Sequence, residues 1–203
     1  LEPLLGRLGR VSVSQLSIFA LELCVQYQPA LQETLHQLIR RSGERLGPQE
    51  KWAMWGQASA ALLAHRAYWY RGCWDFFDDD TRARSDFNMW VSGMLTAEGA
   101  RTEPLAPLGD PYRAGGPRFL TFTMAALMIK GVSTDRQLAE VSSMPVHALC
   151  HGRTFERLLV GIRHINFGFV RGSTLYVIPR DADWALTAQD LEHPKFQYLR
   201  PIA

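Results

Sequence analysis

The stretch FGFVRGSTLYVI, residues 167–178, decides the fold that we predict from the sequence. Two apolar runs flank the dipeptide Arg171-Gly172. A short Gly-containing break between two β-prone runs is typical of a β-hairpin. We therefore predict a hairpin here, with Arg171 at its tip.

Three helices are predicted upstream of this hairpin. Residues 119–130 read as a helix that ends at Gly131, and Thr134 with Gln137 three residues later has the spacing of a capping box. Pro145 suits the first turn of a third helix. Three helices followed by a hairpin is the element order of a winged helix. We expect a winged-helix-like unit, with a C-terminal tail, over residues 119–203.

The third helix of this unit would carry the binding residues. Its predicted core stripe consists of Phe155, Leu158, Leu159 and Ile162. In a winged helix the last helix enters the major groove, and the hairpin touches the backbone of the nucleic acid. The side chains left for DNA, RNA or a partner protein are His147, His151, Thr154, Arg157 and Arg171.

The N-terminal part reads as a helical bundle. Apolar residues recur at helical spacing over 14–41, with an interruption at Pro29 that predicts a kink or two helices in series. Residues 49–76 read as one long helix, and 81–97 as another that follows an acidic start. The predicted fold class is mainly α (α+β), with a bundle over 1–97 and a Pro/Gly-rich linker over 98–118. No internal repeat is visible.

Aromatic residues concentrate on the predicted long helix. The load exceeds what one small core needs, so an interface would use the excess. The residues assigned to this assembly surface are Trp52, Trp55, Trp69 and Trp74.

Composition limits the classes of function. The chain has 203 residues, 47% hydrophobic, with a net charge of +2, which is too small to indicate a nucleic-acid partner by itself. Three widely spaced cysteines favour a reducing, cytoplasmic location. No stretch reaches the length of about 18 apolar residues that a membrane span needs, so no membrane association is expected.

Catalytic signatures are not found, and we assign no catalytic residue and expect no cofactor. His147, Cys150 and His151 have helical spacing suited to zinc, but a zinc site needs further ligands. The acidic cluster of Asp75 and residues 78–80 is better explained by helix capping with local ion pairs than as a cation site. We expect no metal, although a metal-dependent enzyme is kept as a third alternative.

The favoured hypothesis is a non-enzymatic binding or assembly protein whose C-terminal unit binds nucleic acid or a partner protein. The alternative is a structural subunit of a homo- or hetero-oligomer without a nucleic-acid role.

Overall fold

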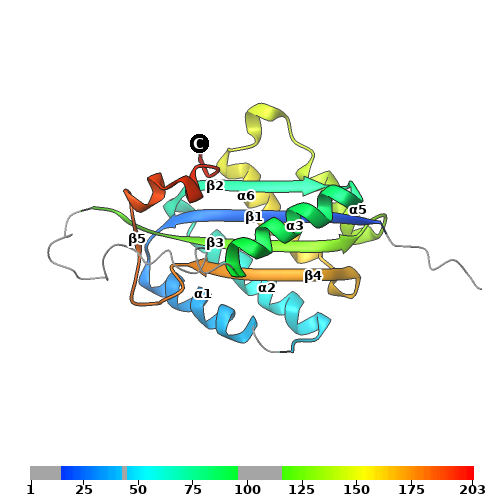
Figure 1. Ribbon diagram of the computed structural model, residues 1–203, viewed down its shortest axis with the longest axis horizontal. Coiled ribbons are helices and arrows are strands. Elements are labelled where there is room, and N and C mark those ends of the chain that lie inside the picture. The colour runs from blue at the N-terminus through cyan, green and yellow to red at the C-terminus, as the bar shows by residue number, and fades with distance from the viewer. Residues whose placement is uncertain (1–14, 43–44, 96–115) are drawn as a thin grey trace, which may run out of the picture.

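A computed structural model of the chain describes residues 15–42, 45–95 and 116–203. Its centre is an antiparallel sheet with the strand order β4-β3-β1-β2-β6. The four long strands are β1 (Leu16–Gln26), β2 (Trp69–Phe77), β3 (Arg118–Ile129) and β4 (Val170–Ile178). The short strand β5 (Leu186–Thr187) pairs with β3, and β6 (Arg200–Pro201) pairs with β2 (Figure 1).

The predicted N-terminal helical bundle is wrong, because residues 16–26 form the central strand β1. All of β1 except its last residue is buried, so both faces of this strand are apolar. A strand buried on both faces loses the alternation that distinguishes it from a helix. Residues 119–130 were misread as a helix for the same reason, since β3 is buried at ten consecutive positions.

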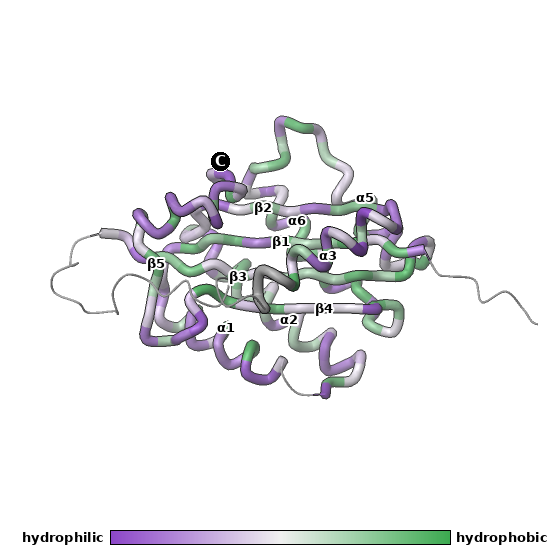
Figure 2. Tube along the Cα trace, in the orientation of Figure 1, coloured by the Kyte–Doolittle hydropathy of each residue, from purple (hydrophilic) through white to green (hydrophobic). Residues whose placement is uncertain are grey.

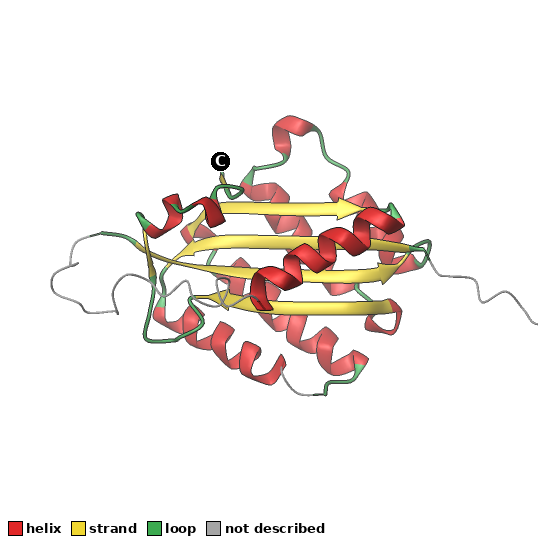
Figure 3. Cartoon of the chain, viewed as in Figure 1, coloured by secondary structure: helices red, strands yellow, loops and turns green. Residues whose placement is uncertain are grey.

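Helices cover both faces of the sheet (Figure 3). Four helices lie on one face: α1 (Pro29–Ser42), α2 (Pro48–Ala64), α5 (Ser133–Ser142) and α6 (Gly152–Gly161). On the other face α3 (Asp80–Leu95) crosses β1 and β3. The predicted kink or pair of helices at Pro29 is wrong, because Pro29 begins α1 after the strand β1. The predicted long helix ends at Ala64, and its aromatic remainder forms β2.

The predicted hairpin is also wrong, and with it the winged helix. Arg171 and Gly172 lie inside the continuous strand β4, paired with β3. A Cβ atom at Gly172 would lie 2.8 Å from the ring of Phe87 on α3. The glycine therefore marks a close approach of a helix to the sheet, which is the other meaning of a glycine inside a strand.

Shorter helical turns connect the main elements. The predicted third helix begins as a 3-10 turn after Pro145, and α6 starts only at Gly152. Its predicted core stripe is confirmed, since Phe155, Leu158, Leu159 and Ile162 are all buried. The 3-10 turns are η1 (Arg66–Tyr68), η3 (Val146–Ala148), η4 (Ile162–His164), η5 (Phe167–Phe169), η6 (Asp190–Glu192) and η7 (Pro194–Phe196).

The same element order occurs twice in the chain. A strand, two helices and an antiparallel strand appear as β1-α1-α2-β2 and again as β3-α5-α6-β4. The two first strands pair at the sheet centre, and the two last strands form its sides. Each half sends a helix under the other half's outer strand, because α1 contacts β4 and α5 contacts β2. The two halves are thus interleaved around one sheet.

The largest apolar cluster fills the space between the sheet and the four-helix layer, with Trp55, Phe122 and Phe155 among its fully buried members. Figure 2 shows the hydrophobic strands at the centre of this arrangement. On the opposite face the apolar contacts divide into two smaller clusters. One lies under α3, and the other lies under the C-terminal tail, residues 179–203.

Candidate functional site: an open edge of the sheet

The outer edge of β2 carries unpaired backbone groups. The Tyr27 N–H donates to the Arg118 carbonyl at 2.7 Å, so the odd-numbered residues of β1 bond to β3. The even-numbered residues then bond to β2, where Glu22 lies opposite Cys73. By alternation, Trp74 and Phe76 direct their N–H and C=O groups away from β1.

The tail occupies only the first part of this edge. Ile202 donates its N–H to the Tyr70 carbonyl at 3.1 Å, and Arg200 lies opposite Gly72. Beyond Gly72, no described strand pairs with the side of β2 that faces away from β1. We call residues 73–77, on this outer side, the β2 edge. Unpaired strand edges are templates for another strand.

A groove of about 380 Å³ runs along the β2 edge. On the helix side its wall consists of Phe155 and of Leu149 and Cys150, from the connector between α5 and α6. The Trp74 Nε1–H donates to the Leu149 carbonyl at 2.9 Å and fixes this connector, which rises past β2 in Figure 1. On the other side the wall is formed by Tyr198 and Arg200 of the tail.

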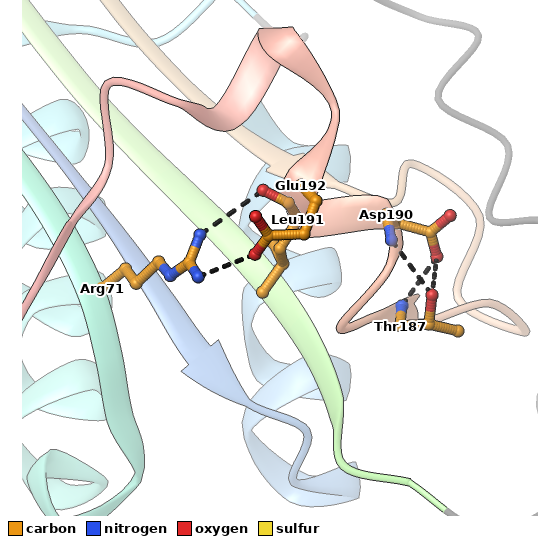
Figure 4. Close-up of polar contacts among 5 residues, drawn as sticks. All are labelled: Arg71, Thr187, Asp190, Leu191 and Glu192. Atoms are coloured by element: carbon orange, nitrogen blue, oxygen red, sulfur yellow. Dashed lines mark hydrogen bonds and ion pairs between the residues drawn. The ribbon is translucent and has the colours of Figure 1, made fainter.

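The tail is held over the sheet by polar contacts (Figure 4). Arg71 of β2 donates to the Glu192 carboxylate at 2.9 Å and to the Leu191 carbonyl at 3.4 Å. Asp190 accepts from the N–H and the hydroxyl of Thr187, both at 2.7 Å, which closes the preceding turn. Because Arg71 precedes the groove directly, these bonds also set the position of its tail-side wall.

A buried carboxyl group lies beneath this wall. Glu22, in the central strand β1, is fully buried and accepts hydrogen bonds from the hydroxyls of Thr123 and Tyr198, both at 2.8 Å. Its Oε1 atom has no partner among the described residues. Burial raises the pKa of Glu22, and the two hydroxyl bonds oppose this only in part. Glu22 therefore positions Tyr198 at the groove.

Asp75 gives the middle of the β2 edge a negative charge. Its side chain is half-buried on the tail side, and burial raises its pKa. Asp86 of α3 adds to this increase, whereas Arg82 opposes it. Arg82 is already engaged, since its Nε lies 3.4 Å from Asp86 and its guanidinium lies 3.3 Å from the centre of the Phe77 ring.

Comparisons with known proteins found no match among family models, curated proteins or solved structures.

The five residues predicted to bind a partner do not form one surface. His147 and His151 are exposed in the connector before α6, and Arg171 is exposed on β4. Thr154 was expected to face away from the core but is buried, donating to the Ala148 carbonyl at 2.6 Å. Arg157 donates to the Glu140 carbonyl at 2.9 Å and so bridges α6 to α5.

The four tryptophans of the predicted assembly surface are divided between two elements. Trp55 is buried in the core, with its ring centre 5.3 Å from that of Phe167. Trp52 is 48% exposed and donates to the Arg163 carbonyl, while Trp69 donates to the Leu62 carbonyl. Only Trp74 lines the groove at the β2 edge.

Neither a metal centre nor a membrane-spanning helix is found in the described residues. Within the described ranges, no three His, Cys, Asp or Glu side chains are grouped so as to hold a metal ion. No helix in the part of the chain that the structure describes is long and apolar enough to span a bilayer.

Sequence reasoning missed Glu22 and Tyr198, and it considered Asp75 only as part of an acidic cluster. One signal was available: Glu22 is the single charged residue within the otherwise apolar run LSIFALELCVQ. A lone carboxylate in such a run lies either on the exposed face of a helix or in a buried polar site. Because the run was interpreted as a helix, the buried site was not considered.

Proposed function

We propose that this chain is a non-enzymatic binding protein that holds an extended segment of a partner protein against the β2 edge. The observation that carries this proposal is the pair of unpaired backbone positions, Trp74 and Phe76, above a groove walled on both sides. Strand addition to an open edge is an established mode of peptide recognition, in which main-chain hydrogen bonds give affinity and side-chain pockets give specificity.

The walls of the groove define the segment that fits. Side chains on the helix side of an added strand would contact Phe155 and Leu149, so apolar residues are favoured there. On the tail side, a positively charged side chain of the segment would lie opposite Asp75 and would be stabilised by its carboxylate. The expected ligand is an extended segment that alternates apolar residues with polar ones and carries one Lys or Arg.

A second copy of the chain fits this edge poorly. Symmetric antiparallel pairing of two β2 edges that bonds Trp74 to Phe76 of the other copy would bring Asp75 opposite Asp75, and like charges opposite each other destabilise a sheet. The connector on one side and the tail on the other also leave room for a single strand rather than a whole domain. A partner segment is therefore favoured over self-association.

Nucleic-acid binding is not proposed, because the winged helix on which that hypothesis depended is not formed: α6 packs in the four-helix layer, and Arg171 lies inside β4 rather than at a hairpin tip. A cytoplasmic location stays a prediction that rests on the three cysteines.

Hydrogen exchange at individual backbone amides tests the proposal. The probe is a short peptide in which valine alternates with threonine and one central threonine is replaced by lysine. We expect slower exchange at the Trp74 and Phe76 amides when this peptide is added. A matched peptide with N-methylated backbone amides is the control and should leave both amides unprotected.

Two outcomes would overturn the proposal. One is equal exchange at Trp74 and Phe76 with and without the lysine peptide at saturating concentration. The other is a salt-sensitive increase in mass, by light scattering, with a mixed-sequence DNA duplex but not with the peptide.

A further inference from the structure

The opposite side of the sheet has a second open edge. Because the even-numbered residues of β3 bond to β1, the odd-numbered ones bond to β4, where Thr123 lies opposite Tyr176. The outward N–H and C=O groups of β4 are then those of odd-numbered residues such as Ser173 and Leu175. No described strand pairs with this side of β4.

The two edges are structural counterparts. The β2 edge is flanked by the helix connector of the second half, residues 143–151, and β4 is flanked by residues 45–47, the described end of the helix connector of the first half. A cavity of about 650 Å³ lies along β4. Its described lining comprises Ser42, Arg45, Leu46, Gly47, Lys51, Met54, Trp55, Ser173, Thr174 and Leu175.

The charge of this second cavity is the reverse of that at Asp75. Arg45 and Lys51 line it, and no carboxylate does so among the described residues. The nearby Glu50 is occupied, since its Oε2 accepts from the Gly47 N–H at 2.7 Å at the start of α2. Neither Arg45 nor Lys51 forms an ion pair with a described carboxylate.

We call the outer side of β4 at residues 173–175 the β4 edge. We propose that it is a second docking site, which accepts an extended acidic segment of a partner protein. The segment would pair its backbone with Ser173 and Leu175 and direct Glu or Asp side chains toward Arg45 and Lys51. The site uses none of the residues of the β2 edge, so the chain can hold two segments of opposite charge at once. That arrangement would make it an adaptor between two partners.

Peptide titration by fluorescence anisotropy, with hydrogen exchange as the locating measurement, tests this site. The probe is a labelled peptide in which valine alternates with glutamate, and the control peptide carries lysine in place of glutamate. We expect the acidic peptide alone to protect the Ser173 and Leu175 amides. The double variant Arg45→Ala/Lys51→Ala should weaken its binding by roughly threefold to tenfold, because each partly exposed ion pair contributes little.

A matched control keeps the net charge of that variant. The double variant Arg153→Ala/Arg163→Ala removes two positive charges elsewhere and should bind the acidic peptide as the unaltered protein does. Equal binding to the Arg45→Ala/Lys51→Ala variant would overturn the proposal. So would stronger protection of Ser173 and Leu175 by a mixed-sequence DNA duplex, which would assign the cavity to nucleic acid.

The two sites can be tested separately. Saturation with the lysine-containing peptide of the β2 edge should not displace the acidic peptide. Competition between the two peptides would contradict a second site, whereas failure of the lysine peptide alone would contradict only the function proposed for β2.

Discussion

The folded state disfavours ionisation of Glu22, because this carboxyl group is fully buried. Its pKa is raised in the folded state, so the native protein holds this proton more tightly than the unfolded chain does. Stability contributed by the protonated carboxyl is therefore lost as the pH rises from the unfolded pKa to the folded one. Each unit of pKa elevation corresponds to about 1.4 kcal/mol.

The variant Glu22→Gln should remove this loss. We expect its free energy of unfolding, measured with urea over a series of pH values, to fall less than that of the unaltered protein between acidic and neutral pH. Glu33→Gln on the exposed side of α1 serves as the control. If the free energy of unfolding of Glu22→Gln changes with pH as much as that of the unaltered protein, Glu22 is not the group that causes the pH dependence.

Asp75 makes recognition at the β2 edge dependent on pH. A cation in the partner segment lowers the pKa of Asp75, so binding releases a proton and weakens as the pH falls through the raised pKa of the free protein. Asp86 and Arg82 are the charged groups of α3 that face Asp75. Asp75→Asn should flatten the pH profile of lysine-peptide binding and reduce affinity about twofold to fivefold at neutral pH.

The control for this measurement is Asp183→Asn, which neutralises an exposed carboxylate of the tail. A pH profile that Asp75→Asn leaves unchanged would remove Asp75 from the recognition of the segment.

At the level of elements, the contact between α3 and β4 depends on a missing side chain. Gly172→Ala would place a Cβ atom 2.8 Å from the Phe87 ring and should destabilise the protein by about 1–3 kcal/mol. Gly56→Ala in α2 is the matched control, because no atom lies within 4 Å of its new Cβ. Chemical denaturation of both variants, and of Gly172→Ala/Phe87→Leu, measures the effect. If Gly172→Ala/Phe87→Leu is no more stable than Gly172→Ala alone, the contact with Phe87 is not the cause of the destabilisation.

Helices could be predicted from the sequence more readily than strands. The start of α1 at Pro29 and the acidic start of α3 reflect bonding within a few residues, as the bond from the Arg82 N–H to Asp79 at 2.8 Å shows. The capping box predicted at Thr134 is wrong, because α5 begins at Ser133 without a side-chain cap and the Thr134 hydroxyl accepts instead from the Asn166 N–H. The identity of β1 and β3 depends on neighbours about a hundred residues away in the chain, as the pairing of Leu16 with Ile129 shows. The local sequence pattern does not identify such distant partners.

The candidate site was hidden for a related reason. Trp74 was noted as an interface residue, but its role depends on being in a strand at the sheet's side rather than on a helix. Gly172 was interpreted as a turn because its true reason, the Phe87 ring, belongs to another element. Composition and motif spacing could limit the classes of function, yet they could not place an open edge.

For the whole molecule, the interleaving of the two halves predicts a single unfolding transition. Strands from both sides of the predicted linker, residues 98–118, pair in one sheet, since β1 pairs with β3 and β2 with β6; most of that linker lies outside the described residues. Tryptophan fluorescence and far-UV circular dichroism should therefore give coincident urea curves. Two separated transitions would instead support independent units over residues 1–97 and 119–203.

The central position of β1 has a consequence for the order in which the chain is made. Synthesis proceeds from the N-terminus, so β1 leaves the ribosome long before β3, its partner on one side, exists. Until residue 129 has emerged, an almost wholly apolar strand lacks half of its hydrogen bonds. Nascent chains of this protein should therefore depend on chaperones most strongly between the emergence of β2 and that of β3.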